Sequence, residues 1–164
     1  ISGWWCMKKP SWKTYALWIV GVEAVGALSG FLTRDGAEVY SEMIRQPPLS
    51  PPAIVFPIVW SILFLLMGVS AARIYAAPAS PDRTRGLRLF AIQLAFNFFW
   101  SIIFFNLQNF GFAFLWLVVL WVLILRMIFT FRKTDSLAAW LQVPYFLWVT
   151  FAAYLNLGVW MLNR

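Results

Sequence analysis

Three tryptophans, Trp60, Trp100 and Trp148, have the positions in this chain that most need a chemical explanation. Each lies inside a long apolar segment, away from its charged ends, whereas tryptophans that anchor a membrane protein lie at the interface with water. Aromatic walls with a few polar groups are what a flat, apolar ligand requires, so these residues predict a binding pocket. Four other tryptophans fit the interfacial role: Trp4, Trp5, Trp12 and Trp140.

Polar side chains within the apolar segments need a partner or a purpose, because lipid cannot hydrogen-bond them. Gln93, Asn97 and Ser101 recur every four residues and therefore share one helix face. That face is either a set of interhelical hydrogen bonds or a polar strip that lines a pocket. Glu23, the acid in the middle of a span, is either a proton or ligand contact or a protonated or hydrogen-bonded group facing another helix.

Gly26 and Gly30 form a pair of small residues in the first apolar segment, with Ser29 beside them. Such a pair lets two helix backbones approach closely. We interpret it either as the face of a homodimer or as a packing face between helices of one chain.

The composition is that of a membrane protein. Of 164 residues, 62% are hydrophobic and 12% are charged, with a mean hydropathy of +0.76, whereas a soluble domain is about half apolar and about a quarter charged. The single cysteine, Cys6, excludes an internal disulfide. The absence of histidine excludes histidine-based acid–base chemistry and the usual zinc and haem ligands, so no metal and no required cofactor is expected.

Five segments are long and apolar enough to cross a bilayer as helices, since a span needs about 20 residues. They lack the alternation of barrel strands. The sequence therefore predicts an all-α integral membrane protein: a five-transmembrane-helix bundle that forms one domain at 14–164, after an N-terminal extension at 1–13. Residues 1–6 precede Met7, which fits a natural start, and are given no role. The predicted spans are Thr14–Leu32, Pro52–Ala76, Leu87–Leu107, Phe110–Phe131 and Leu137–Leu162.

The first connection, Thr33–Pro51, is the longest of those between the spans. Helix-like spacing of its apolar residues predicts a short amphipathic helix, followed by a rigid proline-rich stretch with Pro52 opening the second span. Long ordered loops are often functional, so we expect the mouth of the pocket here. Arg45 would then suit a ligand with carboxylates. The other connections are predicted as a polar linker at 77–85 and tight turns at 108–109 and 132–135.

The basic residues predict an orientation. Ten of them flank the side shared by the N-terminus and the second and fourth connections, against three on the other side. This bias predicts a cytoplasmic N-terminus in a plasma membrane, with the proline-rich loop outside. The formal charge of +7 is therefore assigned to the positive-inside pattern and not to nucleic-acid binding.

Three motifs in order resemble those of a known family. The second span contains Pro51-Pro52, Phe56, Trp60, Phe64 and Met67-Gly68; the third contains Gln93, Asn97, Trp100 and Phe104-Phe105; the fifth contains Pro144-Tyr145, Trp148, Phe151-Ala152 and Leu155-Asn156. This pattern resembles the TspO/MBR family of tryptophan-rich sensory proteins, whose animal member is the translocator protein, or peripheral benzodiazepine receptor. The resemblance extends from Trp18 to Asn163.

The resemblance implies a five-helix bundle, often dimeric, with a ligand pocket near the first loop. It implies a membrane receptor for tetrapyrroles such as protoporphyrin IX and haem and for related hydrophobic molecules, with a role in porphyrin transport or stress signalling. The alternative is a light- and oxygen-dependent porphyrin-degrading enzyme, for which Trp60 and Trp148 are the catalytic candidates. The implied ligand-binding residues are Pro51, Phe56, Trp60, Phe64, Asn97, Trp100, Trp148 and Ala152.

The chain departs from the family pattern in three places. Tyr40-Ser41 stands where the loop often carries a Trp-Tyr pair, and Phe64 stands where a tyrosine is common. The animal sterol motif needs a tyrosine closely followed by a basic residue, whereas Tyr154 is far from Arg164. Tight cholesterol binding is therefore not expected.

Overall fold

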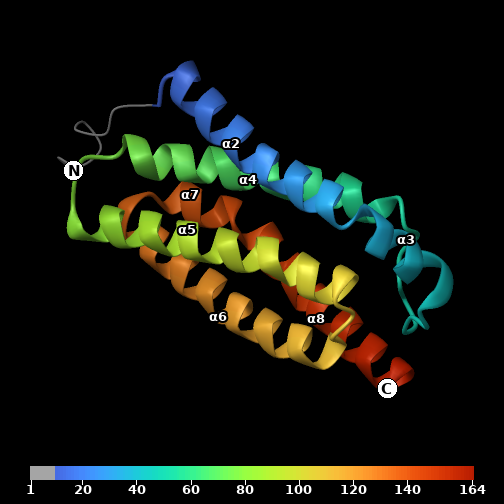
Figure 1. Ribbon diagram of the computed structural model, residues 1–164. Coiled ribbons are helices and arrows are strands. Elements are labelled where there is room, and N and C mark those ends of the chain that lie inside the picture. Colours follow the sequence, from blue (N-terminus) through green and yellow to red (C-terminus); the bar gives the residue numbers. More distant parts are fainter. Residues whose placement is uncertain (1–9) are drawn as a thin grey trace.

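The computed structural model describes residues 10–164, and within this range every regular element is a helix (Figure 1). Five helical segments are long and apolar enough to cross a membrane, and a short helix joins the first two. This confirms the predicted five-helix bundle and its helical loop. The predictions for residues 1–6 and for Trp4 and Trp5 lie outside the described residues. The elements are α2 (Trp12–Leu32), α3 (Arg34–Met43), α4 (Val55–Ala76), α5 (Pro81–Ser101), the π-helical turn η1 (Ile102–Asn106), α6 (Phe110–Thr134), α7 (Ser136–Leu141) and α8 (Val143–Asn163).

Polar side chains cap the helices at the membrane ends. Ser11 Oγ accepts from Thr14 N at the start of α2, and Asn109 Oδ1 accepts from Phe112 N at the start of α6. Ser80 caps α5, whose first residue is a proline, and a proline at that position loses no helical hydrogen bond. This cap explains why α5 begins at Pro81, inside the stretch predicted as a linker.

The structure corrects three predicted boundaries, each at a proline or a cap. The second span begins at Val55 and not at Pro52, whose carbonyl accepts a turn hydrogen bond from Val55 N. The predicted turn 132–135 is the single residue Asp135, because α6 continues to Thr134 and Asp135 caps α7. The fifth span is two helices broken at Gln142, because Pro144 has no N–H and cannot continue the hydrogen bonding of α7.

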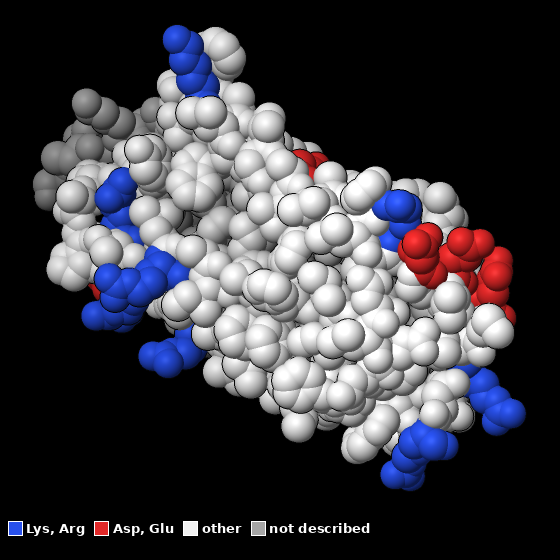
Figure 2. Space-filling view, viewed as in Figure 1, with Lys and Arg blue, Asp and Glu red and all other residues white. Residues whose placement is uncertain are grey.

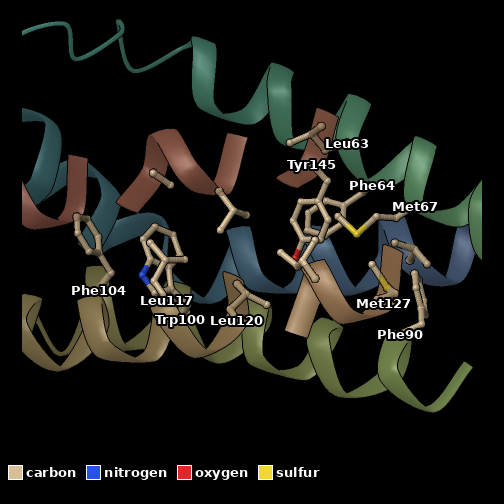
Figure 3. Close-up of a cluster of buried hydrophobic side chains, with 14 of the residues drawn as sticks. Leu63, Phe64, Met67, Phe90, Trp100, Phe104, Leu117, Leu120, Met127 and Tyr145 are labelled. Carbon is tan, nitrogen blue, oxygen red and sulfur yellow. The ribbon is translucent and has the colours of Figure 1, made fainter. Parts of the chain in front are cut away.

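The helices are arranged around a continuous apolar core. In Figure 1, α2 runs beside α4 and α5 beside α6, while α8 packs mainly on α6 and α7 packs on both α4 and α6. Figure 3 shows the buried side chains between them, with Trp100 and Phe104 toward one end and Met67 and Phe90 toward the other. The first span is the most peripheral: Val22 and Ser29 are its buried residues.

Most charged side chains lie at the two ends of the molecule, and the broad band between them is uncharged in Figure 2 except for an acidic group at its upper edge. Basic side chains predominate at the end that carries the start of α2, the start of α5 and the end of α6, whereas acidic ones gather over α3. At the basic end Arg73 donates to Asp135 and ties α4 to the start of α7. Trp12 and Trp140, which are exposed, belong to the same end, as interfacial anchors should.

Helix α2 approaches the backbone of α4 closely at Gly68. A methyl group at this position would lie 2.7 Å from Ile19 Cα, so Gly68→Ala should force the helices apart and lower the free energy of unfolding by about 1–3 kcal/mol. Equilibrium unfolding in mixed detergent micelles measures this. Gly21→Ala is the control, since a methyl group there meets nothing within 4 Å. Equal stability of the two variants would contradict the packing described.

Candidate functional site

A cavity of about 780 Å³ lies at the α3 end of the bundle. Its walls come from α2, α3, α4, α8 and the end of α5 with η1. Exposed lining residues lie on α3 (Glu38, Ser41 and Glu42), around the start of α4 (Ala53 and Pro57) and farther along α2 and α4 (Ala27, Gly30 and Ser61), so the cavity is open at this end and between α2 and α4. The volume falls within the range of about 300–1,000 Å³ that small-molecule sites occupy.

Most of the predicted ligand-binding residues line this one cavity. Pro51 does not, and the connection between α3 and α4 contributes Ala53 instead. Whether any of these side chains binds a ligand stays a prediction. The predicted residues found in the lining are Phe56, Trp60, Phe64, Asn97, Trp100, Trp148 and Ala152.

The aromatic wall is centred on Trp60. Its ring stacks on Phe64 at 5.6 Å and meets Trp148 edge-on at 6.4 Å, with an interplanar angle of 90°. Phe56 also meets Trp148 edge-on, with the ring centroids 6.0 Å apart. Phe56, Trp60 and Phe64 share one face of α4 because they are spaced four residues apart, so a regular helix suffices to build this wall.

Trp148 also carries an unused hydrogen-bond donor. Its Nε1 is buried and has no acceptor among the described residues. Trp100, by contrast, donates from Nε1 to Asn156 Oδ1 at 3.0 Å, and Asn156 Nδ2 donates to Phe110 O at 2.8 Å. Of these two lining tryptophans, Trp100 is therefore held by a side-chain hydrogen bond and Trp148 is not.

A buried hydrogen-bond network forms the base of the site. Tyr145 Oη donates to Gln93 Oε1 at 2.7 Å and accepts from Asn97 Nδ2 at 2.8 Å. Gln93 is fully buried and lies outside the lining, whereas Asn97 and Ser101 belong to it. Both interpretations of the polar face therefore hold: Gln93 and Asn97 make interhelical hydrogen bonds, and Asn97 and Ser101 line the cavity.

Tyr145 and Asn156 were not predicted as site residues. They lie eleven residues apart, or three helical turns, and so share one face of α8. Two polar residues at that spacing in an apolar span are a signal that could have identified them.

The first span, α2, contributes two glycines and one carboxylate to the cavity lining. A methyl group at Gly26 would lie 2.5 Å from the Phe64 ring, whereas Gly30 borders open space. Gly26 thus serves packing within the chain, and both glycines line the cavity. Glu23 lines it as well, half-buried and without an ion pair to any residue of 10–164.

Helix α3 closes part of the cavity and is held in place by aromatic contacts. Tyr40 packs against Phe104 at 5.2 Å and Phe105 at 5.5 Å. Burial raises the pKa of Tyr40 to about 12, so its hydroxyl is neutral at physiological pH. At Gly36 a methyl group would meet Phe105 O at 2.5 Å, so only glycine fits there.

The proline-rich connection is tied to α8. Arg45 N donates to Asn163 Oδ1 at 3.0 Å, Asn163 Nδ2 donates back to Arg45 O at 2.7 Å, and Tyr154 Oη donates to Pro48 O at 2.6 Å. Arg45 is exposed in this connection and is not part of the cavity lining, so its predicted contact with a ligand stays a prediction. The charged residues at the mouth are Glu38 and Glu42, spaced four apart on α3.

Comparisons with known proteins agree with the architecture. The model of the TspO/MBR family matches residues 16–161. Protein CrtK of Rhodobacter capsulatus is 35% identical over 150 residues, 91% of this chain and 92% of that protein. The tryptophan-rich protein TspO of Chlorobaculum tepidum is 36% identical over 92% of this chain and 96% of its own length. The translocator protein of Ovis aries is 30% identical over 88% of this chain and 89% of its own.

The network around Tyr145 makes a prediction about stability. Tyr145→Phe removes the hydroxyl that pairs with both Gln93 and Asn97, and leaving such buried groups unpaired costs about 1–3 kcal/mol. Equilibrium unfolding in mixed micelles should show that loss. Tyr75→Phe is the matched control, because Tyr75 is half exposed and its hydroxyl bonds to no described residue. A Tyr145→Phe protein as stable as the control would show that the network does not hold α5 to α8.

Proposed function

We propose that this chain, which belongs to the TspO/MBR family, is a membrane receptor that binds flat hydrophobic ligands, tetrapyrroles such as protoporphyrin IX and haem among them. The observation that carries the proposal is the cavity walled by Trp60, Phe64 and Trp148. Membrane embedding and a receptor role agree with the family; the ligand class is argued from the site.

Two properties of the cavity support a planar ligand. Its walls are broad aromatic faces and edges, which favour offset-stacked or edge-to-face contact with another ring system by about 0.5–1.5 kcal/mol for each pair. One opening lies at an end of the bundle, next to the exposed turns of α3 and α4, where an amphipathic ligand could enter from the membrane interface.

The orientation is part of the proposal. Among the described residues the basic side chains predominate at the end opposite α3 (Figure 2), and the positive-inside rule places that end in the cytoplasm. The cavity then opens toward the outer face of a bacterial plasma membrane.

Ligand affinity tests the pocket. Protoporphyrin IX should quench the tryptophan fluorescence of the purified protein, and Trp60→Phe or Trp148→Phe should each raise Kd about 2- to 10-fold, the equivalent of one lost aromatic contact. Trp140→Phe is the control, because Trp140 is exposed at the opposite end of the bundle and lies outside the cavity lining. Affinity unchanged in both pocket variants would refute the assignment.

A second candidate function is light- and oxygen-dependent degradation of a bound porphyrin. The observation that favours it is the pair Trp60 and Trp148, whose rings are 6.4 Å apart and both line the cavity. An excited porphyrin held against them could oxidise an indole, with molecular oxygen as the terminal oxidant. No acid–base pair is needed for this chemistry.

Illumination separates degradation from binding. An enzyme should convert protoporphyrin IX to a defined product over more than one turnover in light and air, and Trp60→Phe or Trp148→Phe should abolish that product while Trp140→Phe retains it. Product yields no higher than those of free tryptophan or of denatured protein would leave the receptor as the sole function.

A further inference from the structure

Arg126 is a charged residue on an exposed side of a membrane span. It belongs to α6, and its backbone carbonyl accepts from Thr130 Oγ1 at 2.8 Å. Its side chain makes no ion pair and no hydrogen bond with any residue of 10–164. An arginine within a span is costly and needs a partner, so this position calls for an explanation.

Arg126 lies deeper than the basic residues that flank a span. The helix rises about 25 Å from Asn109, which caps the start of α6, to Arg126, whereas the hydrocarbon is about 30 Å thick. Arg132, the next basic residue, lies about 9 Å farther along the axis. The Cα–Cβ bond of a helical residue tilts toward the helix N-terminus, here toward the bilayer centre, so this side chain is poorly directed toward water at the basic end.

An exposed stripe of α6 contains Arg126 and has the pattern of a lipid molecule. From Leu115 to Arg126 the stripe is apolar over about 16 Å, close to the half-thickness of the hydrocarbon, about 15 Å. Beyond Arg126 it ends on a second cation at the membrane surface. The residues of the stripe, at spacings of three and four, are Leu115, Val119, Val122, Arg126, Phe129 and Lys133.

The stripe runs beside α5. A methyl group at Gly86 of α5 would lie 3.7 Å from Thr130 Cγ2, so Thr130 faces α5, and Arg126 lies one turn before it on nearly the same side of α6. Figure 1 shows α5 and α6 side by side along this length. A lipid on the stripe would therefore lie along the junction of the two helices.

No carboxylate at the basic end is available to Arg126 or Lys133. The described acids at this end are Asp82 and Asp135, and each is already paired, Asp82 with Arg85 at 3.6 Å and Asp135 with Arg73. Residues 1–9 include no acid in their sequence. The anion that balances the stripe must therefore come from outside the chain, and a bilayer supplies it as phospholipid phosphate.

We propose that this stripe binds an anionic phospholipid of the leaflet at the basic end, with the phosphate between Arg126 and Lys133 and an acyl chain along Leu115–Val122. A guanidinium can donate two parallel hydrogen bonds to one phosphate. Two cations favour a lipid of net negative charge over one whose headgroup carries its own ammonium. The proposal does not depend on what the cavity binds.

Native mass spectrometry of the protein in detergent micelles measures the affinity of single lipids. The probes are phosphatidylglycerol and phosphatidylcholine with identical acyl chains. We expect the native protein to bind the first phosphatidylglycerol about 5-fold or more tightly than the first phosphatidylcholine. Arg126→Gln should raise the Kd of phosphatidylglycerol about 5-fold, the equivalent of one basic residue at an anionic lipid surface, and leave the Kd of phosphatidylcholine within about 2-fold.

Arg88→Gln is the matched control. Arg88 is exposed, belongs to the same end of the molecule and has no ion pair among residues 10–164, so this variant loses the same charge. It lies two residues beyond Gly86, about 200° round α5, and so is turned away from α6 and the stripe. Its Kd for phosphatidylglycerol should stay within about 2-fold of the native value.

Thermal unfolding in the same micelles gives a second measurement. Added phosphatidylglycerol should raise the midpoint of the native protein and of Arg88→Gln by more than that of Arg126→Gln, because a ligand stabilises only the protein that binds it. Equal lipid affinities of Arg126→Gln and Arg88→Gln would overturn the proposal. So would a native protein that binds the two lipids equally well.

Discussion

The hydroxyl of Tyr145 is the contact on which the site depends. It joins α5 to α8 in the apolar band, accepting from Asn97 and donating to Gln93. Polar groups in lipid must be satisfied inside the protein, so this network fixes the relative position of the two helices. Asn97 and Trp100 on one side and Trp148 and Ala152 on the other then face the same space.

The other walls of the cavity form by close packing around this hydrogen-bond network. Gly68 lets α2 approach α4, and Gly26 lets the Phe64 ring lie against α2, so the first span closes the cavity although few of its residues are buried. Helix α3 covers the end through Tyr40 and its aromatic neighbours. The outcome is an aromatic chamber with Glu38 and Glu42 at its opening, and the proposed binding of flat ligands rests on the aromatic walls.

The sequence predicted the fold well because the determining property, about 20 apolar residues per span, is local. The aromatic wall was also predictable, since residues four apart on one helix must share a face. Details that depend on contacts between distant segments could not be predicted from the sequence. The hydrogen bonds between Arg45 and Asn163 could not be inferred from either segment. The break at Gln142 follows from Pro144, whose effect on the last span was not anticipated.

A structure of the protein in nanodiscs with a bound porphyrin tests the central claim most directly. We predict that the ring lies within the cavity in contact with Trp60 and Trp148. A porphyrin on the lipid-facing surface of α2, with the cavity unoccupied, would contradict it.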